Sequence, residues 1–413
     1  MSMLSRRTAV VVFLAFAVAY FFSALIRAIT ATLSPTLTQE FSLNARDLGL
    51  LAGGYFLGFA VMQLPLGNWL DRHGPKKVIL SFLAVAVAGC LAFSWATSFG
   101  GLLLARILCG AGLGACLMAP LTGYRRWFGA NTQLRANSWM LMTGSMGMVA
   151  STLPVQWLMP LLGWRPLFWG LAGMMVLAMV AIAWQVPAWQ TPLPAAGQAQ
   201  PKRSYAEVWR HPYFRKMTPI GFFNYGGMVA IQTLWAVPWM IRVAGYAPVQ
   251  AATGLFGLNM AMLVTFWTWG LVNPKLARRG IHVDRLIALG APLSLLLLAI
   301  ICFAGDALSS WSGVLLALFC VSSTFISLAQ PAVGMAFPTE LAGRALSAYN
   351  LVIFAGIFVV QWGIGLLIDS LQAFGWSPVR AFQGAMAVFL VLCVASYVYF
   401  LAAKSHNQAS TAS

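Results

Sequence analysis

Long apolar runs alternate with short polar connections along almost the whole chain. A run of about 18 or more apolar residues has the length that a membrane-spanning helix needs. Such runs occur twelve times, at residues 8–34, 48–70, 77–97, 100–123, 138–161, 165–186, 217–241, 251–273, 284–304, 310–337, 346–368 and 379–403. The pattern therefore predicts an all-α integral membrane protein with twelve transmembrane helices, and it leaves almost no residues for a soluble domain.

The composition of the chain excludes an ordinary soluble protein. Of its residues, 60% are hydrophobic and 8% are charged, whereas soluble domains carry about 25% charged residues. The first residues, "MSMLSRRTAVVVFLAFAVAYFF", have the basic start and apolar centre of a signal peptide. Their apolar run is too long for one, however, and no cleavage site with small residues follows at a suitable distance. We interpret this segment as the first spanning helix.

The net charge of +17 would usually suggest a nucleic-acid partner, but the positions of the basic residues argue against one. We place the N-terminus in the cytoplasm. Of the 25 Lys and Arg residues, Arg46, Arg165, Arg242 and Arg380 then fall on the opposite side and Arg27 and Arg106 within helices, so that the other 19 are cytoplasmic. This asymmetry follows the positive-inside rule, and the basic segments also attract anionic lipid. The sequence therefore predicts cytoplasmic termini, the lipid bilayer as a partner and no nucleic-acid partner.

One long polar connection, at residues 187–216, divides the runs into six and six. It is rich in Pro, Ala and Gln and then becomes basic, as expected of a cytoplasmic linker. The organisation predicted is a six-helix bundle at 1–186, the linker at 187–216, and a second bundle with a short tail at 217–413. The halves also resemble each other, since "GWRPLFWG" at Gly163 returns as "GWSPVRAF" at Gly375. Parallel six-helix repeats are a known plan of secondary transporters.

The connection between the second and third runs carries the clearest motif, "GNWLDRHGPKK". It resembles the signature loop between helices two and three of the major facilitator superfamily, and the resemblance covers the whole chain. The residues that match the family pattern are Gly67, Asp71, Arg72, Gly74 and Lys76. Two positions depart from it, with Trp69 in place of the usual Leu and Pro75 in place of the usual Arg. The resemblance implies two six-helix bundles and transport by alternating access.

We predict that this loop forms a conformational latch between the two halves, in which Asp71 makes the main contact. At the cytoplasmic rim its carboxylate can reach the positive N-terminal end of span eleven, while Arg72 and the lysines meet carboxylates or lipid headgroups. A charged contact that forms in one conformation and breaks in the other is what alternating access requires. The alternative, ordinary flanking charge, explains Arg72 and Lys76 but not Asp71. In the second half Ala277 stands where Asp71 would be, so that a symmetrical second latch is not expected.

The fourth run contains "ARILCGAGLGA", in which Arg106 precedes spaced glycines. This resembles a second pattern of the family, and small residues at such spacing let helices pack closely in lipid. We predict a structural or gating role for Arg106 and Gly110, with direct substrate contact by Arg106 as the alternative. The Gly-Pro-Gly-Gly cluster that drug–proton antiporters of the family carry in helix five is missing from "MTGSMGMVASTLP", which argues against drug efflux.

Arg27 is the candidate substrate-binding residue, because it is the one charge within the first apolar run. It lies about 20 residues into that run, roughly 30 Å at 1.5 Å per residue, and Tyr20, Arg27 and Ser34 share one helical face. The resemblance implies that helices one, four, seven and ten line the cavity, and that organic-anion carriers hold their substrate with an Arg in helix one. No acidic residue or histidine lies within a span, and an unpaired buried guanidinium is costly. Anion binding resolves this cost; pairing with helix carbonyls and water is the alternative.

Further polar and aromatic residues in spans seven, ten and eleven are predicted to complete the cavity. They are Asn224, Gln232, Trp235, Gln330, Tyr349 and Asn350. Taken singly, each also suits a hydrogen bond between helices or an interfacial aromatic position. As a set, with Arg27 as the single charge, they indicate a monoanion with an apolar or aromatic body.

We therefore predict a secondary active transporter that moves a small organic anion across a bacterial-type inner membrane and that functions as a monomer. No cofactor or metal is expected, since the six cysteines all fall in predicted spans without metal-binding spacing. Coupling to a proton gradient or to a counter-anion stays open. The alternatives are efflux of drugs or amphiphiles, and a transporter-like solute sensor, for which the linker and tail offer little surface. An enzyme is not expected, because no nucleophile–base set or phosphate loop is present.

Overall fold

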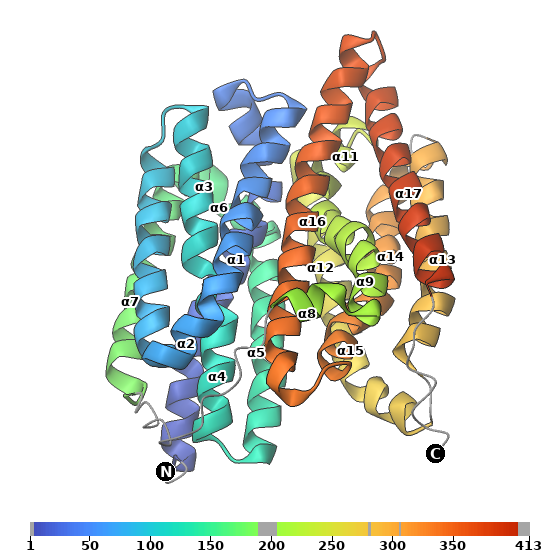
Figure 1. Ribbon diagram of the computed structural model, residues 1–413. Coiled ribbons are helices and arrows are strands. Elements are labelled where there is room, and N and C mark those ends of the chain that lie inside the picture. Colours follow the sequence, from blue (N-terminus) through green and yellow to red (C-terminus); the bar gives the residue numbers. More distant parts are fainter. Residues whose placement is uncertain (1–3, 189–204, 280–281, 305–306, 404–413) are drawn as a thin grey trace.

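The computed structural model describes residues 4–188, 205–279, 282–304 and 307–403, and every element in them is a helix (Figure 1). Those of the first half are α1 (Arg6–Phe41), α2 (Ala45–Trp95), α3 (Phe99–Leu113), α4 (Ala115–Trp127), α5 (Ala130–Ala150), α6 (Leu153–Leu162) and α7 (Trp164–Gln185). Short polar side chains cap their starts: Ser5, Asn44 and Ser98 each accept a hydrogen bond from a backbone N–H of the helix that follows.

The second half is more segmented. Its α-helices are α8 (Tyr205–Arg210), α9 (Pro212–Pro219), α10 (Gly226–Ala230), α11 (Ala236–Arg242), α12 (Pro248–Arg278), α13 (Val283–Ala304), α14 (Ser312–Ser323), α15 (Ala329–Met335), α16 (Thr339–Ala373) and α17 (Pro378–Ala402). Two π-helical turns, η1 (Ile220–Tyr225) and η2 (Ile231–Trp235), and two 3₁₀ turns, η3 (Ser309–Trp311) and η4 (Thr324–Leu328), join some of them. Such turns inside a long helix commonly mark hinges or functional sites.

Within the described residues, nine helical stretches are long and apolar enough to cross a membrane. They account for ten of the twelve predicted runs, because α2 contains both 48–70 and 77–97 and reverses at Gly74, whose φ of 77° is in the left-handed region. The other two runs are interrupted. Run 217–241 comprises α9 to α11 with both π turns, and run 138–161 is divided between α5 and α6. The all-helical membrane class is thus confirmed, whereas the number twelve stays a prediction.

The interruption between α5 and α6 has a local cause. The hydroxyls of Ser151 and Thr152 donate to the carbonyls of Met148 and Val149, at 2.7 and 2.6 Å, which draws the backbone away from regular helix. Pro154 follows at the second position of α6, where its missing N–H costs nothing. Hydrophobicity alone does not show such a break, since both sides of it are apolar.

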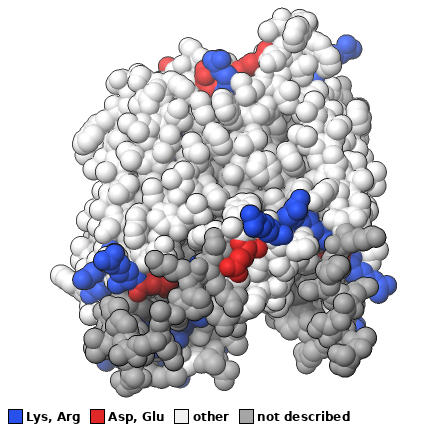
Figure 2. Space-filling view, in the orientation of Figure 1, with Lys and Arg blue, Asp and Glu red and all other residues white. Residues whose placement is uncertain are grey.

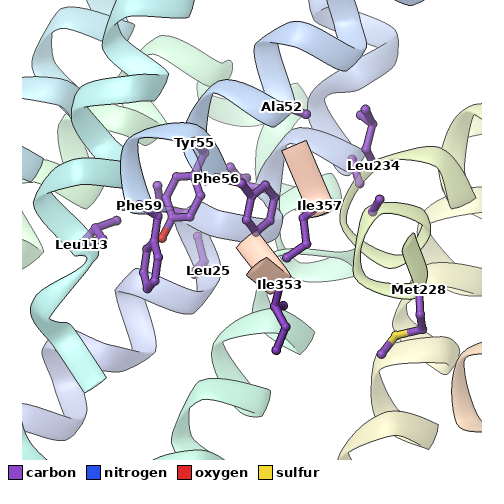
Figure 3. Close-up of a cluster of buried hydrophobic side chains, with 14 of the residues drawn as sticks. Leu25, Ala52, Tyr55, Phe56, Phe59, Leu113, Met228, Leu234, Ile353 and Ile357 are labelled. Atoms are coloured by element: carbon purple, nitrogen blue, oxygen red, sulfur yellow. The ribbon is translucent and has the colours of Figure 1, made fainter. Parts of the chain in front are cut away.

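Helices from the two halves of the sequence gather on opposite sides of the molecule in Figure 1, and α2 packs along α16 while α5 packs against α12. Tyr55, Phe56 and Phe59 of α2 lie beside Ile353 and Ile357 of α16 in a buried hydrophobic cluster (Figure 3). The domain boundaries stay predictions. Of the predicted linker, residues 189–204 lie outside the described residues, and the tail is described only to residue 403.

The surface has the character of a protein that lies in lipid. Large apolar side chains are exposed, among them Leu104 (60%), Leu161 (78%) and Leu289 (72%), whereas a soluble monomer rarely exposes large apolar patches. Figure 2 shows charged side chains at the upper end of the face in view and again from about mid-height downward, with an uncharged band between the two groups. We refer to the two ends as the Asp71 end and the Asp369 end.

Candidate substrate site and contacts between the halves

Arg27 projects from α1 toward α5. Its Nη2 donates to the Sδ of Met148 at 3.6 Å, and its Nε is buried without a hydrogen-bond partner in the described part of the chain. Tyr20, two turns earlier on the same face, rests its ring on Gly144 of α5, where an added Cβ would lie 2.5 Å from a ring carbon. The predicted shared face of Tyr20 and Arg27 is therefore present, and it is α5 that covers it.

Two tyrosines that sequence reasoning missed lie near this guanidinium. Tyr225, from η1 in the second half, lies within electrostatic range of the Arg27 guanidinium. Tyr55, from α2, feels the charges of Arg27 and Arg106, and its hydroxyl is buried without a hydrogen-bond partner among the described residues. Tyr225 precedes the candidate Gln232 by seven residues, so the two share one helical face. This spacing could have identified Tyr225 as a candidate from the sequence. Arg27 thus lies among phenol groups from both halves.

Arg106 of α3 is fully buried, with 0% of its surface exposed. Its Nη1 donates to the carbonyl of Ile26 at 2.9 Å. Ile26 is the residue immediately before Arg27. The guanidinium also lies 5.1 Å from the centre of the Tyr55 ring, and its Nε and Nη2 have no partner within the described ranges. These contacts attach Arg106 to the backbone that carries Arg27. They agree with the structural role expected of it, which stays a prediction.

Gly110, one turn after Arg106, explains how α2 and α3 approach so closely. A Cβ at this position would lie 1.8 Å from the backbone oxygen of Tyr55. No other residue fits there without moving one helix, because the obstacle is backbone and not a flexible side chain. Gly110 thereby allows Tyr55 to lie beside Arg106. The gating role predicted for Gly110 is not tested by this contact and stays a prediction.

No carboxylate offsets these two arginines within the described residues. The ion pairs found there join Arg46 to Asp47, Arg165 to Glu40 and Lys216 to Asp284, and none involves Arg27 or Arg106. A buried guanidinium stays protonated under all ordinary conditions, and an uncompensated one is expensive. The centre of the molecule therefore carries an excess of positive charge that an anion would neutralise.

The six second-half candidates use their polar groups within their own half. Asn224 donates to Ser396 and to the carbonyl of Cys393, Gln232 to Asn259 (2.9 Å), Trp235 to the carbonyl of Gln361 (3.1 Å), Gln330 to Asn350, and Tyr349 to the carbonyl of Met217 (3.1 Å). This is the helix–helix bonding that the sequence left open as an alternative. Among the described residues none of them forms a hydrogen bond with Arg27, although η2, which carries Gln232 and Trp235, packs against α1. Their part in substrate binding stays a prediction.

At the Asp71 end, the signature loop is partly exposed, with Gly74 and Pro75 buried. Asp71 and Arg72 are both exposed, Lys76 is half-buried, and Gly67 has no heavy atom near its added Cβ. The charges that act on Asp71 come from Arg125 of α4 and Arg344 of α16. Since Arg344 lies in the second turn of α16, the loop faces the helix end to which the latch was predicted to attach, but Asp71 makes no hydrogen bond to it in the described part of the chain.

At the opposite end, α2 and α16 are in direct backbone contact. A Cβ added to Gly49 would lie 2.4 Å from the carbonyl oxygen of Gln361, and one added to Gly365 would lie 2.3 Å from that of Ala45. Asp369 lies one turn beyond Gly365 on α16. Its Oδ1 accepts from the N–H of Ala45 at 3.1 Å and its Oδ2 from that of Arg46 at 2.8 Å. The halves are thus closed on each other at the Asp369 end.

Residues 16–361 match the Major Facilitator Superfamily. With most of the chain matched, the protein belongs to this family and is a multi-pass membrane transporter of a bacterial-type inner membrane. The family assignment made from the signature loop is confirmed.

Among curated relatives, a gallate transporter from Pseudomonas putida is 25% identical, over 87% of this chain and 87% of its own length. The inner membrane transport protein YajR of Escherichia coli is 29% identical over 48% of this chain and 43% of its own. The 4-hydroxybenzoate transporter PcaK of Acinetobacter baylyi is 28% identical over 33% of this chain and 30% of its own. The chain thus spans less than half of two of these relatives and most of the third.

Solved structures share the fold. A bacterial homologue of the human lysosomal transporter Spinster, in an inward-facing and occupied conformation, has a TM-score of 0.76 at 17% identity, covering 97% of both chains. A D-xylose–proton symporter has a TM-score of 0.79 at 13% identity, covering 96% of this chain and 98% of its own. Identity this low shows the common architecture only.

Proposed function

We propose that this protein is a secondary active transporter of a small organic anion, and specifically of an aromatic monocarboxylate. The observation that carries the proposal is the surrounding of Arg27. Its guanidinium has one unpaired nitrogen, no carboxylate pairs with it among the described residues, and a tyrosine from each half lies within its electrostatic range. A guanidinium fork suits a carboxylate, and phenol rings suit an aromatic body. The relatives named for gallate and 4-hydroxybenzoate support the same class.

The transport mechanism proposed is alternating access between two six-helix bundles, with twelve spans and both termini in the cytoplasm. The positive-inside asymmetry supports the orientation in which the Asp71 end is cytoplasmic. The Asp369 end is closed by backbone contacts between α2 and α16, which supports an inward-facing assignment of this conformation. In the outward-facing state the contact at Asp369 breaks and the contact of Asp71 with α16 forms.

Thermal unfolding of the purified protein with candidate anions tests this function. The panel contains gallate, 4-hydroxybenzoate, a hexuronate, sulfoacetate and a lipophilic cation, applied to wild type, Arg27→Ala and the control Arg215→Ala. Arg215 is an exposed arginine of α9, a helix that packs against other second-half elements such as η1 and α17. A ligand that binds the folded state alone stabilises it by about 2.7 kcal/mol at 100 times its Kd.

We expect the aromatic monocarboxylates to stabilise wild type and Arg215→Ala but not Arg27→Ala. Equal stabilisation of all three proteins would contradict the role of Arg27. Stabilisation by the cation and by none of the anions would point to efflux of amphiphiles. Uptake of the stabilising anion into proteoliposomes then shows whether a proton gradient or an internal anion drives it.

A further inference from the structure

A groove of about 580 Å³ lies on the first half, between the two runs of α2 and the α3–α4 stretch. Its walls include Trp69, Phe82, Val85 and Ala111, and its mouth carries His73 and Lys77. It lies away from Arg27, on the side of α2 that packs against α3 and not on the side that meets α16. No contact described for the substrate site involves these residues.

The groove follows from the local backbone. Gly74 reverses the chain, and the two runs of α2 diverge from it. At the floor, a Cβ on Gly112 would lie 2.3 Å from the backbone nitrogen of Ala86, so that α3 touches the second run directly. Trp69 forms one wall and meets Phe82 edge to face, with ring centres 5.8 Å apart. Trp69 is also one of the two departures from the family's loop pattern.

The lining changes from charged to apolar along one helical face. Lys77, Ser81 and Val85 are spaced by four residues, so they share a face, and all three are exposed. His73 stands on the other side of Gly74, at the same end, and is exposed as well. Neither His73 nor Lys77 forms an ion pair in the described part of the chain. A cationic mouth above an apolar, exposed channel matches the two ends of one phospholipid.

We propose that this groove binds an anionic phospholipid of the phosphatidylglycerol type. Its phosphate receives hydrogen bonds from the ammonium of Lys77 and the imidazole N–H of His73, and one acyl chain lies between Trp69 and Val85. Tryptophan is the side chain most suited to the depth at which headgroup meets acyl chain. Basic residues at this end face the cytoplasmic leaflet, where anionic lipids attract them. The proposal does not depend on the transported substrate.

Native mass spectrometry of the full chain in detergent tests it. Palmitoyl-oleoyl phosphatidylglycerol and the phosphatidylcholine with identical chains are titrated separately onto wild type, Lys77→Gln, Val85→Trp and Arg215→Gln. Wild type should bind the anionic lipid more tightly. A basic residue near an anionic surface contributes about 1 kcal/mol, or about fivefold, so Lys77→Gln should lose about this factor of preference. Val85→Trp fills the groove and should weaken both lipids, whereas Arg215→Gln, which removes a basic residue elsewhere, should equal wild type.

Three results would overturn the proposal. One is equal binding of the two lipids by wild type. Another is an unchanged preference in Lys77→Gln, and the third is an equal loss in Arg215→Gln, which would mean that overall charge and not this groove selects the lipid. Inorganic phosphate is added as a competitor: if it displaces the lipid headgroup at low concentration, the site binds phosphate and the apolar channel is incidental. Thermal midpoints of the four proteins show whether each variant is folded.

Discussion

Asp369→Asn should open the end of the transporter that is closed here. The side chain joins the halves because its carboxylate accepts the first two N–H groups of α2, at 3.1 and 2.8 Å. The third N–H, that of Asp47, is taken by Asn44 within the first half, at 2.8 Å. Helix starts leave their first N–H groups without partners inside the helix, so Asp369 from α16 serves the two donors that Asn44 does not.

The size of the effect follows from the helix dipole. A negative side chain at a helix N-terminus contributes about 0.3–1 kcal/mol, and up to about 2 kcal/mol where it is partly buried. Asp369 is half-buried. Asn keeps one of the two acceptor oxygens and loses both the charge and one hydrogen bond, so we expect a loss of at least about 1 kcal/mol from the closed state. The ratio of open to closed molecules should then rise at least about fivefold.

Pulsed electron–electron double resonance measures the distance between two spin labels, and its distance distribution gives the ratio of open to closed molecules. Nitroxide labels on Thr97→Cys and Phe374→Cys report the separation of the halves, because both positions are exposed at the Asp369 end. All six native cysteines are buried, which keeps the labelling selective. Asp47→Asn is the matched control, since it removes a carboxylate from the same helix start without crossing between halves. A distance distribution that is identical in wild type and Asp369→Asn would refute the reasoning and leave the glycine contacts as the sole closure.

Three further outcomes are expected. Arg106→Met should raise the thermal midpoint of the free protein, since burying a charge carries an effective penalty of roughly several kcal/mol per ion, and yet weaken anion binding; a destabilised variant that binds normally would contradict this. Gly144→Ala should raise the KM of aromatic more than of aliphatic anions, because the added methyl displaces the Tyr20 ring; equal changes would show that the ring does not contact substrate. Burial lowers the pKa of His211. As the pH decreases, His211 is therefore protonated in the unfolded chain before it is protonated in the folded protein. The folded protein loses stability at pH values below about 6.5. His211→Phe should reduce this loss in thermal scans, and an unchanged pH profile would exclude His211 as its source.

The membrane class could be predicted from the sequence because lipid imposes one rule on the backbone. Every N–H and C=O must be paired inside the segment, so long apolar runs become helices. The rule fails locally where side chains or proline supply other partners. Run 138–161 divides at Ser151 and Thr152, whose hydroxyls take carbonyls of the preceding turn. Hydroxyl residues occur in unbroken spans as well, so their presence did not foretell the break.

The surroundings of Arg27 could be predicted only on its own helix. The spacing of Tyr20 and Arg27 places them on one face whatever surrounds α1, and this face is present. Their neighbours depend on how the halves pack, which no local pattern specifies. Tyr225 reaches the site from the second half, and Tyr55 reaches it because glycines let α2 and α3 touch. The second-half amides are equally suited by residue type, but they form hydrogen bonds with residues of other helices in the second half.

The second buried arginine changes the electrostatics of the site without changing the number of charges that a substrate can touch. Arg106 is fully enclosed and bonded to the carbonyl of Ile26, so a ligand cannot pair with it unless α1 and α3 separate. Its charge nevertheless acts through a medium of low polarity, where electrostatic attraction reaches farther than in water. An entering carboxylate would therefore be attracted by two guanidinium groups and bound by one. This arrangement suits a monoanion, because a second carboxylate would find attraction but no donor to pair with.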